Sequence, residues 1–107
     1  LIELGADVNC KTDYGETPLH FSCKNGNFDI VNKLIEFGAD IHCKTKNRKT
    51  PLHFACENGN FDIVNKLIEA GADIHYKDKD GNTPIQICIS KNHTELAKLL
   101  KELGAHC

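Results

Sequence analysis

The most constraining feature of this chain is a repeat with a fixed step. The tetrapeptide Thr-Pro-Leu-His begins at position 17 and again at position 50, 33 residues later, and the variant Thr-Pro-Ile-Gln begins at position 83. The dipeptide Gly-Ala keeps the same step and starts at four glycines: Gly5, Gly38, Gly71 and Gly104. Fixed self-similarity of this kind is the signature of a stacked repeat array, in which each unit buries its apolar face only against its neighbours. The 107 residues leave room for about three units, which is close to the fewest that make a stable stack.

The first complete unit shows how its local structure is encoded. Thr17 is suited to cap a helix and Pro18 to occupy its first position, so we expect a short helix up to the break at 25–27, Asn-Gly-Asn. Apolar residues at helical spacing then predict a second helix over 28–35, which ends before the next Gly-Ala. The polar remainder predicts a turn built around Tyr14-Gly15. Neither helix is long enough to be stable alone, so packing between units must hold them.

With this period and the motif Thr-Pro-Leu-His, the chain resembles the ankyrin-repeat family from end to end. The resemblance implies an all-α fold, a solenoid of helix-turn-helix units with protruding hairpin-like fingers. It also implies a function, because the fingers and first helices of such a solenoid line a concave surface that binds other proteins. On this register the chain is a single ankyrin-repeat domain in four segments: the tail of an upstream repeat at 1–11, repeats at 12–44 and 45–77, and a C-terminal capping repeat at 78–107.

The two ends of the array differ from its middle. In the last copy Lys101 stands where the preceding copy has Ile68, so we expect the outer face of the last helix to meet water, as a capping repeat requires. Residues Leu1 to Leu4 read as part of a helix whose partner lies upstream. We therefore expect the sequence to be a segment of a longer protein, with apolar surface exposed at its N-terminal end.

The six cysteines could form a disulfide framework, but the repeat register argues against it. Cys10 and Cys43 are equivalent positions, as are Cys23 and Cys56, and equivalent residues on stacked helices lie about 8–10 Å apart. A disulfide needs Cα atoms within about 7 Å. The other two cysteines share no register position with these or with each other. We predict six free thiols on small buried side chains, and hence a reducing, intracellular compartment, most simply the cytoplasm.

Two His-x-x-Cys motifs, His20 with Cys23 and His53 with Cys56, look like halves of a metal site. Zinc needs four ligands that converge within about 2.0–2.3 Å, and the two motifs lie a full repeat apart. The ankyrin resemblance instead makes this histidine a structural residue that hydrogen-bonds within and between fingers. The chain also shows no nucleophile elbow, glycine-rich phosphate loop or unrepeated acid–base cluster. We therefore predict no metal, no cofactor, no catalytic residue and no enzymatic activity.

Charge is unevenly distributed in a chain whose formal net charge is −2. The predicted finger and first-helix side carries nine basic and five acidic residues, whereas the remainder carries four basic and ten acidic residues. Lys11, Lys44 and Lys77 recur one step apart and are expected to form a ladder on the finger side. A nucleic-acid site usually combines a basic domain with aromatic or arginine contacts, and this chain has one arginine and a negative total. We expect a protein partner with an acidic segment, and neither nucleic acid nor membrane; a merely solvated face remains the alternative.

The first two copies differ at only 8 of 33 positions, and four of these differences fall at the predicted finger tip, 13–16 against 46–49. Another, Lys24 against Glu57, lies on the first helix. A constant framework with variable tips is typical of a recognition scaffold, although drift after a recent duplication would look the same. The predicted partner-binding residues are Asp13, Tyr14, Glu16, Lys24, Lys46, Asn47, Lys49, Glu57, Lys79, Asp80 and Asn82.

Tyr14 is the preferred anchor among these residues, because exposed aromatic side chains are enriched at binding hot spots. We expect a monomer that presents the finger side chains rigidly, so that little conformational entropy is lost on binding. Two other roles stay open. The array could be a structural spacer, or a regulatory segment that acts within a larger multidomain protein.

Overall fold

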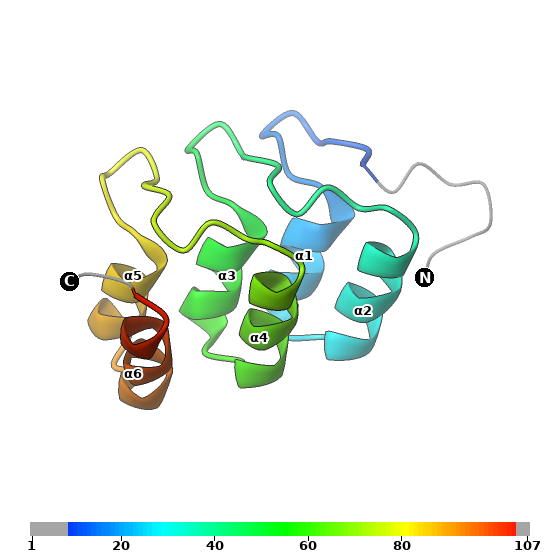
Figure 1. The fold of residues 1–107 in the computed structure, drawn as a ribbon. Helices are drawn as coiled ribbons and strands as arrows, with labels where there is room; N and C mark the ends of the chain where they lie inside the picture. Colours follow the sequence, from blue (N-terminus) through cyan, green and yellow to red (C-terminus); the bar gives the residue numbers. More distant parts are fainter. Residues whose placement is uncertain (1–8, 105–107) are drawn as a thin grey trace.

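The computed structural model describes residues 9–104, which form six α-helices and no strand. The helices come in three antiparallel pairs, one to each copy of the repeat (Figure 1): α1 Pro18–Asn25 with α2 Phe28–Glu36, α3 Pro51–Asn58 with α4 Phe61–Glu69, and α5 Pro84–Ser90 with α6 Thr94–Glu102. The all-α solenoid expected from the repeat is confirmed. The interpretations made for Leu1 to Leu4 lie outside the described residues.

The threonine of each Thr-Pro pair starts a first helix, as the sequence predicts. The hydroxyl oxygens of Thr17 and Thr50 accept the backbone N–H of the histidine three residues on, His20 or His53, at 3.4 Å. The histidine returns the bond, since its Nδ1 accepts the threonine N–H at 2.9 Å in the first copy and 3.1 Å in the second. The two bonds satisfy N–H groups that the start of a helix would otherwise leave unpaired.

The third copy starts its first helix differently, because Gln86 replaces the histidine. The side-chain oxygen of Gln86 accepts the Thr83 N–H at 2.9 Å, but the buried Thr83 hydroxyl has no partner among the described residues. A buried hydroxyl without a partner costs about 1–3 kcal/mol. The cap of α5 is therefore weaker than the caps of α1 and α3.

In the first two copies, glycine and asparagine join the two helices of a pair. Gly26 and Gly59 adopt left-handed backbone, with φ of 73° and 80°, and the side chains of Asn27 and Asn60 cap the helices that follow. The Asn60 side chain also donates to the Gly26 carbonyl at 3.4 Å. The turn of one copy thus depends on the turn of the next.

The core lies between the helix pairs. The first helices stack α1 on α3 and α3 on α5, and α2 packs on α4. Each copy buries the same two register positions almost completely, one in the first helix and one in the second: Leu19, Leu52 and Ile85, and Leu34, Leu67 and Leu100. Lys101 is exposed on the last helix, as expected for a capping copy. Each pair therefore covers its apolar face with the neighbouring pair.

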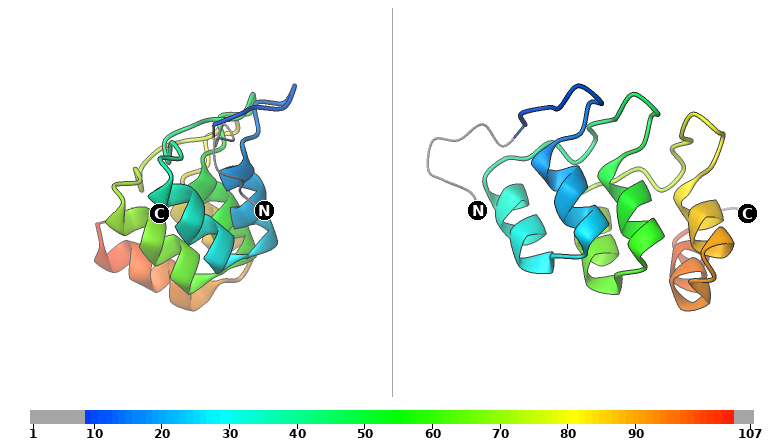
Figure 2. Two further views of the ribbon diagram at one scale, coloured as in Figure 1. Left: turned by 90° about the vertical axis from the view of Figure 1, so that its right-hand side faces the viewer. Right: turned by 180° about the vertical axis from the view of Figure 1, so that it is seen from behind.

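The fingers rise above the helices and lean toward the side of the first helices (Figure 2, left). Backbone atoms alone join one finger to the next at two places. The Lys46 N–H donates to the Tyr14 carbonyl at 3.0 Å, and the Lys79 N–H donates to the Asn47 carbonyl at 2.8 Å. These bonds fix the spacing of the fingers without using any side chain.

A buried histidine in each of the first two copies, His20 or His53, ties the base of the following finger to its own copy. Because Nδ1 of each histidine accepts a threonine N–H, Nε2 carries the proton and donates. The Nε2 of His20 lies 3.2 Å from the carbonyl oxygens of both Cys43 and Lys49, and the Nε2 of His53 lies 3.0 Å from that of Asn82. Burial lowers the pKa of both histidines, which favours the neutral form that this arrangement requires. The histidines thus have the structural role that the ankyrin resemblance implies.

Stability should fall as the pH drops below 6.5. The unfolded chain protonates its histidines near pH 6.5, whereas burial delays protonation of His20 and His53 in the folded chain. Between the two pKa values the unfolded state binds more protons, so we expect a lower Tm at about pH 5.5 than at about pH 7.5 in thermal melts followed by circular dichroism. A Tm that stays constant or rises on acidification would contradict the assignment.

Two matched histidine variants test whether His53 contributes to the expected pH dependence of stability. His53→Gln reproduces the Gln86 arrangement of the third copy, and should reduce the pH dependence while lowering the free energy of unfolding at neutral pH by about 1 kcal/mol. His42→Gln changes an exposed histidine and is the control for replacing an imidazole outside the helix caps. The same pH dependence in H53Q and wild type would place the proton uptake elsewhere.

Gly59 should tolerate substitution less well than Gly71. A Cβ at Gly59 would lie 2.6–2.8 Å from three atoms of the His93 ring, whose Nε2 lies 3.1 Å from the Glu57 carbonyl oxygen. Gly59→Ala therefore adds a displaced hydrogen bond to the cost of a left-handed backbone, about 2–4 kcal/mol of unfolding free energy in all. At Gly71, with φ of 102° and open space around it, Gly→Ala should cost about 1–2 kcal/mol. Urea unfolding of both variants measures the difference, and equal losses would mean that His93 moves aside freely.

Candidate functional site

A groove opens between the first two fingers and the helices beneath them. It has a volume of about 480 Å³, and we refer to it as the finger groove. Its lining comes from both fingers and from α1 and α3: Tyr14, Glu16, Lys24, Thr45, Lys46, Asn47, Lys49 and Phe54. Six of the eight are residues that the sequence predicts to bind a partner. Stacking therefore brings together candidate side chains from two different copies of the repeat.

Phe54 supplies the apolar part of the groove. Its side chain is only 6% exposed, and the His20 ring packs edge-on against it with the centroids 5.4 Å apart. The Lys49 ammonium lies 5.7 Å from the Phe54 ring centroid and 3.2 Å from the Glu57 Oε2. The aromatic ring and the ion pair both restrain Lys49, so this side of the groove is held in place.

Two other cations of the groove are available to a ligand. Lys24 and Lys46 are exposed, and neither forms an ion pair within residues 9–104. Tyr14, beside them in the lining, is 71% exposed. Glu16 is the one carboxylate among the lining residues. The lining is therefore positive overall and attracts carboxylate groups.

The other five predicted residues lie outside the groove lining. Asp13 is exposed on the first finger, and Glu57 is half-buried in its ion pair. Lys79, Asp80 and Asn82 are all exposed on the third finger. The structure thus divides the prediction into a set that lines the groove and a set that extends beyond it along the fingers.

Comparison with known families bears on the whole length of the chain. The family profile described as ankyrin repeats, three copies, matches residues 1–78 and, in a second overlapping match, residues 29–107. The chain belongs to the ankyrin-repeat family. Ankyrin repeats generally mediate protein–protein interactions and are typically noncatalytic. A search of curated proteins gave no match. In this ankyrin array, no helix within residues 9–104 is both long and apolar enough to cross a membrane.

Two groove residues of the ankyrin array escaped the sequence prediction, Thr45 and Phe54. Both are identical to their counterparts in the first copy, Thr12 and Phe21, and the prediction relied on positions at which the copies differ. Their role comes from position in the stack. Phe54 packs on His20 of the preceding copy and is nearly buried, whereas Phe21 is 40% exposed. Comparing the two copies for sequence differences cannot identify a residue that is identical in both copies but has different neighbours in each.

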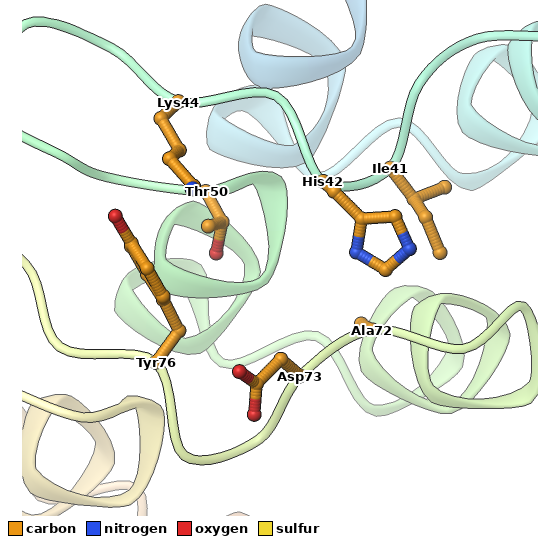
Figure 3. A pocket seen from close by; sticks show the side chains of 7 residues that line it. All are labelled: Ile41, His42, Lys44, Thr50, Ala72, Asp73 and Tyr76. Carbon is orange, nitrogen blue, oxygen red and sulfur yellow. The ribbon is translucent and has the colours of Figure 1, made fainter.

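A second, smaller hollow lies between the segments that follow α2 and α4 (Figure 3). Its volume is about 120 Å³, and it is lined by Ile41, His42, Lys44, Thr50, Ala72, Asp73 and Tyr76. The Lys44 ammonium lies 4.6 Å from the Tyr76 ring centroid. Lys44 thus has a cation–π partner at Tyr76, which stands where the first copy has Cys43. The ladder of Lys11, Lys44 and Lys77 stays a prediction. The hollow is well below the roughly 300 Å³ of the smallest usual ligand pockets.

The cysteines are only partly placed as expected. Of the five described, four are buried and Cys10 is exposed, so the expectation of buried thiols is wrong at Cys10; none of the five is in a disulfide. The neighbouring thiol of Cys88 in α5, together with burial, raises the pKa of Cys56 in α3. The sequence prediction compared only cysteines at equivalent positions of the repeat, so it did not pair Cys56 with Cys88. Within residues 9–104, no three metal-ligating side chains converge, and both ring nitrogens of His20 and of His53 are hydrogen-bonded.

The two register-equivalent phenylalanines should contribute unequally to stability. Phe54→Ala removes a nearly buried ring and should lower the free energy of unfolding by about 3–5 kcal/mol. Phe21→Ala removes a ring that is 40% exposed and should cost about 1–2 kcal/mol. Urea unfolding of both variants is the measurement. Equal losses would mean that Phe21 is covered in solution, and a concentration dependence would then identify self-association as the cause.

Proposed function

We propose that this ankyrin array is a noncatalytic protein-interaction module that binds an acidic segment of a protein partner in the finger groove, on the concave finger and first-helix face. The observation that carries the proposal is a convergence. Six residues singled out in the sequence, from two copies of the repeat, line one groove. All six stand at positions where two otherwise similar copies differ, and a shared framework holds them in place.

The chemistry of the groove indicates the chemistry of the partner. Lys24 and Lys46 offer ammonium groups without an ion-pair partner in the described part of the chain, and Tyr14 offers an exposed ring. Phe54 adds an apolar contact beneath them. This combination suits a segment in which carboxylates flank an apolar or aromatic side chain. Tyr14 is the proposed anchor, because aromatic residues dominate binding hot spots.

Binding to this surface costs little conformational entropy in the array. The backbone bond from Lys46 to Tyr14 holds the first two fingers together, and the imidazole of His20 ties the base of the second finger to the first copy. Side chains on such a preorganised frame lose few degrees of freedom when a partner docks. Recognition by rigid presentation is therefore the proposed mechanism.

The proposal extends along the array beyond the groove. Asp13 on the first finger, and Lys79, Asp80 and Asn82 on the third, would lengthen the contact with a partner. The array would act as a monomer, without nucleic acid or membrane, and its buried thiols suit a reducing, intracellular compartment. The alternative is an intramolecular role, in which the segment regulates or spaces other domains of a larger multidomain protein.

Charge reversal in the groove should weaken binding of acidic peptides. Peptides selected on the immobilised array from a random library should be enriched in Asp and Glu. The double variant K24E/K46E should bind the best of them about tenfold more weakly by fluorescence anisotropy, because two exposed charge contacts become repulsive. For the wild type, affinity should fall as salt rises from about 50 to about 300 mM, since exposed charges are screened.

The matched control is K33E/K66E, which reverses two lysines on the second helices α2 and α4. Its affinity should stay within about twofold of wild type, and circular dichroism should show that both double variants are folded. A larger loss in the control would place the partner on the opposite face. A spacer would enrich no acidic peptide on the groove.

A further inference from the structure

Each of the three finger turns requires left-handed backbone at the same place. The residues there are Gly15, Arg48 and Gly81, with φ of 78°, 60° and 82°. In the second finger the Arg48 N–H closes the turn by donating to the Thr45 carbonyl at 2.9 Å. The fold therefore imposes this conformation, and of the three fingers only the second, one of the two that line the groove, has a residue with a side chain there.

Arginine is poorly suited to that conformation. Its Cβ approaches the following carbonyl oxygen, a contact that glycine avoids. Asn92 is the other described residue, apart from glycines, with a positive φ, and asparagine adopts this conformation far more readily. The left-handed backbone at position 48 is therefore energetically unfavourable for arginine.

Nothing in the described part of the chain compensates for this strain. The Arg48 side chain is exposed, and within residues 9–104 it forms no hydrogen bond, ion pair or ring contact. Its neighbours on either side, Asn47 and Lys49, both line the finger groove. Strained backbone of this kind, with no use inside the fold, is characteristic of residues that contact a ligand.

Arg48 also differs in kind from the cations around it. It is the only arginine in the chain, in which Lys and Arg together number 13. A guanidinium is planar and donates two parallel hydrogen bonds to a carboxylate, whereas a lysine ammonium acts as a point charge. An arginine at the tip can therefore distinguish the orientation of a carboxylate, which Lys46 and Lys49 cannot do.

We propose that Arg48 is the specificity-determining residue of the finger groove, and that it binds a carboxylate of the acidic partner segment through a bidentate pair. This rests on the proposed function. The strain at the tip of the second finger is retained because glycine, which the turn would favour, has no side chain to make that contact.

Three substitutions at this position separate strain, charge and geometry. R48G removes both the side chain and the strain, R48A removes the side chain alone, and R48K keeps the charge but loses the planar fork. Thermal melts should show a Tm about 4 °C or more above wild type for R48G, and close to wild type for R48A and R48K. A Tm of R48G at or below that of wild type would overturn the strain argument and the inference with it.

Binding is measured with fluorescein-labelled hexaglutamate, with hexaglutamine as the uncharged control probe. R48G and R48A should bind hexaglutamate about tenfold more weakly than wild type, and R48K at least about threefold more weakly. No variant should change binding of hexaglutamine. Wild-type affinity in R48K would show that charge alone suffices, and wild-type affinity in R48G would show that Arg48 makes no contact; either overturns the proposal.

The role of the groove is tested separately by measuring how tightly K24E/K46E binds the same hexaglutamate probe. Weakened binding by K24E/K46E with intact binding by R48G leaves the proposed function standing and removes only the role of Arg48. Loss of binding in R48G alone would move the site from the groove to the finger tip. Absence of hexaglutamate binding by the wild-type array would overturn the carboxylate assignment.

Discussion

The neutral imidazole that follows the first two Thr-Pro pairs, His20 or His53, contributes to helix capping, finger attachment and aromatic packing. In the first copy, Nδ1 of His20 completes the cap of α1, Nε2 donates to two carbonyls at the base of the next finger, and the ring edge packs on Phe54. One side chain thus links helix initiation, finger attachment and the apolar part of the groove. These three functions require a buried ring with one protonated nitrogen, so the architecture depends on the protonation state of a single residue type.

The sequence predicted the local structure well because that structure is locally encoded. Thr17 with Pro18 marks the start of a helix, and the 33-residue step places a Thr-Pro pair in every copy. Asn-Gly-Asn marks the turn between helices in the first two copies, whereas the third copy has Lys91-Asn92-His93 there. The six helices follow from these signals, and the family comparison agrees. The divergent finger positions also pointed to residues that the structure brings into one groove, because they share a place in neighbouring copies.

What the sequence could not reveal depends on contacts between copies. Phe21 and Phe54 are the same residue at the same register position, yet only Phe54 has a described copy before it to pack on. Lys44 lies over a ring that is present in the second copy alone. The Cys88 thiol influences the pKa of Cys56 because stacked helices bring non-equivalent positions near each other. In a repeat protein the register fixes the position of each residue within its copy, whereas the neighbouring copies determine which residues it contacts.

The bonds between fingers have a consequence for how such an array can change over time. Lys46 to Tyr14 and Lys79 to Asn47 are joined by their main-chain N–H and C=O groups, which every residue other than proline can supply. The side chains at these positions can therefore be exchanged without altering finger spacing. Mutations can therefore change the side chains at the finger tips while the backbone spacing stays the same. Because the backbone holds the fingers and the side chains form the surface, new binding surfaces can evolve without a change of fold.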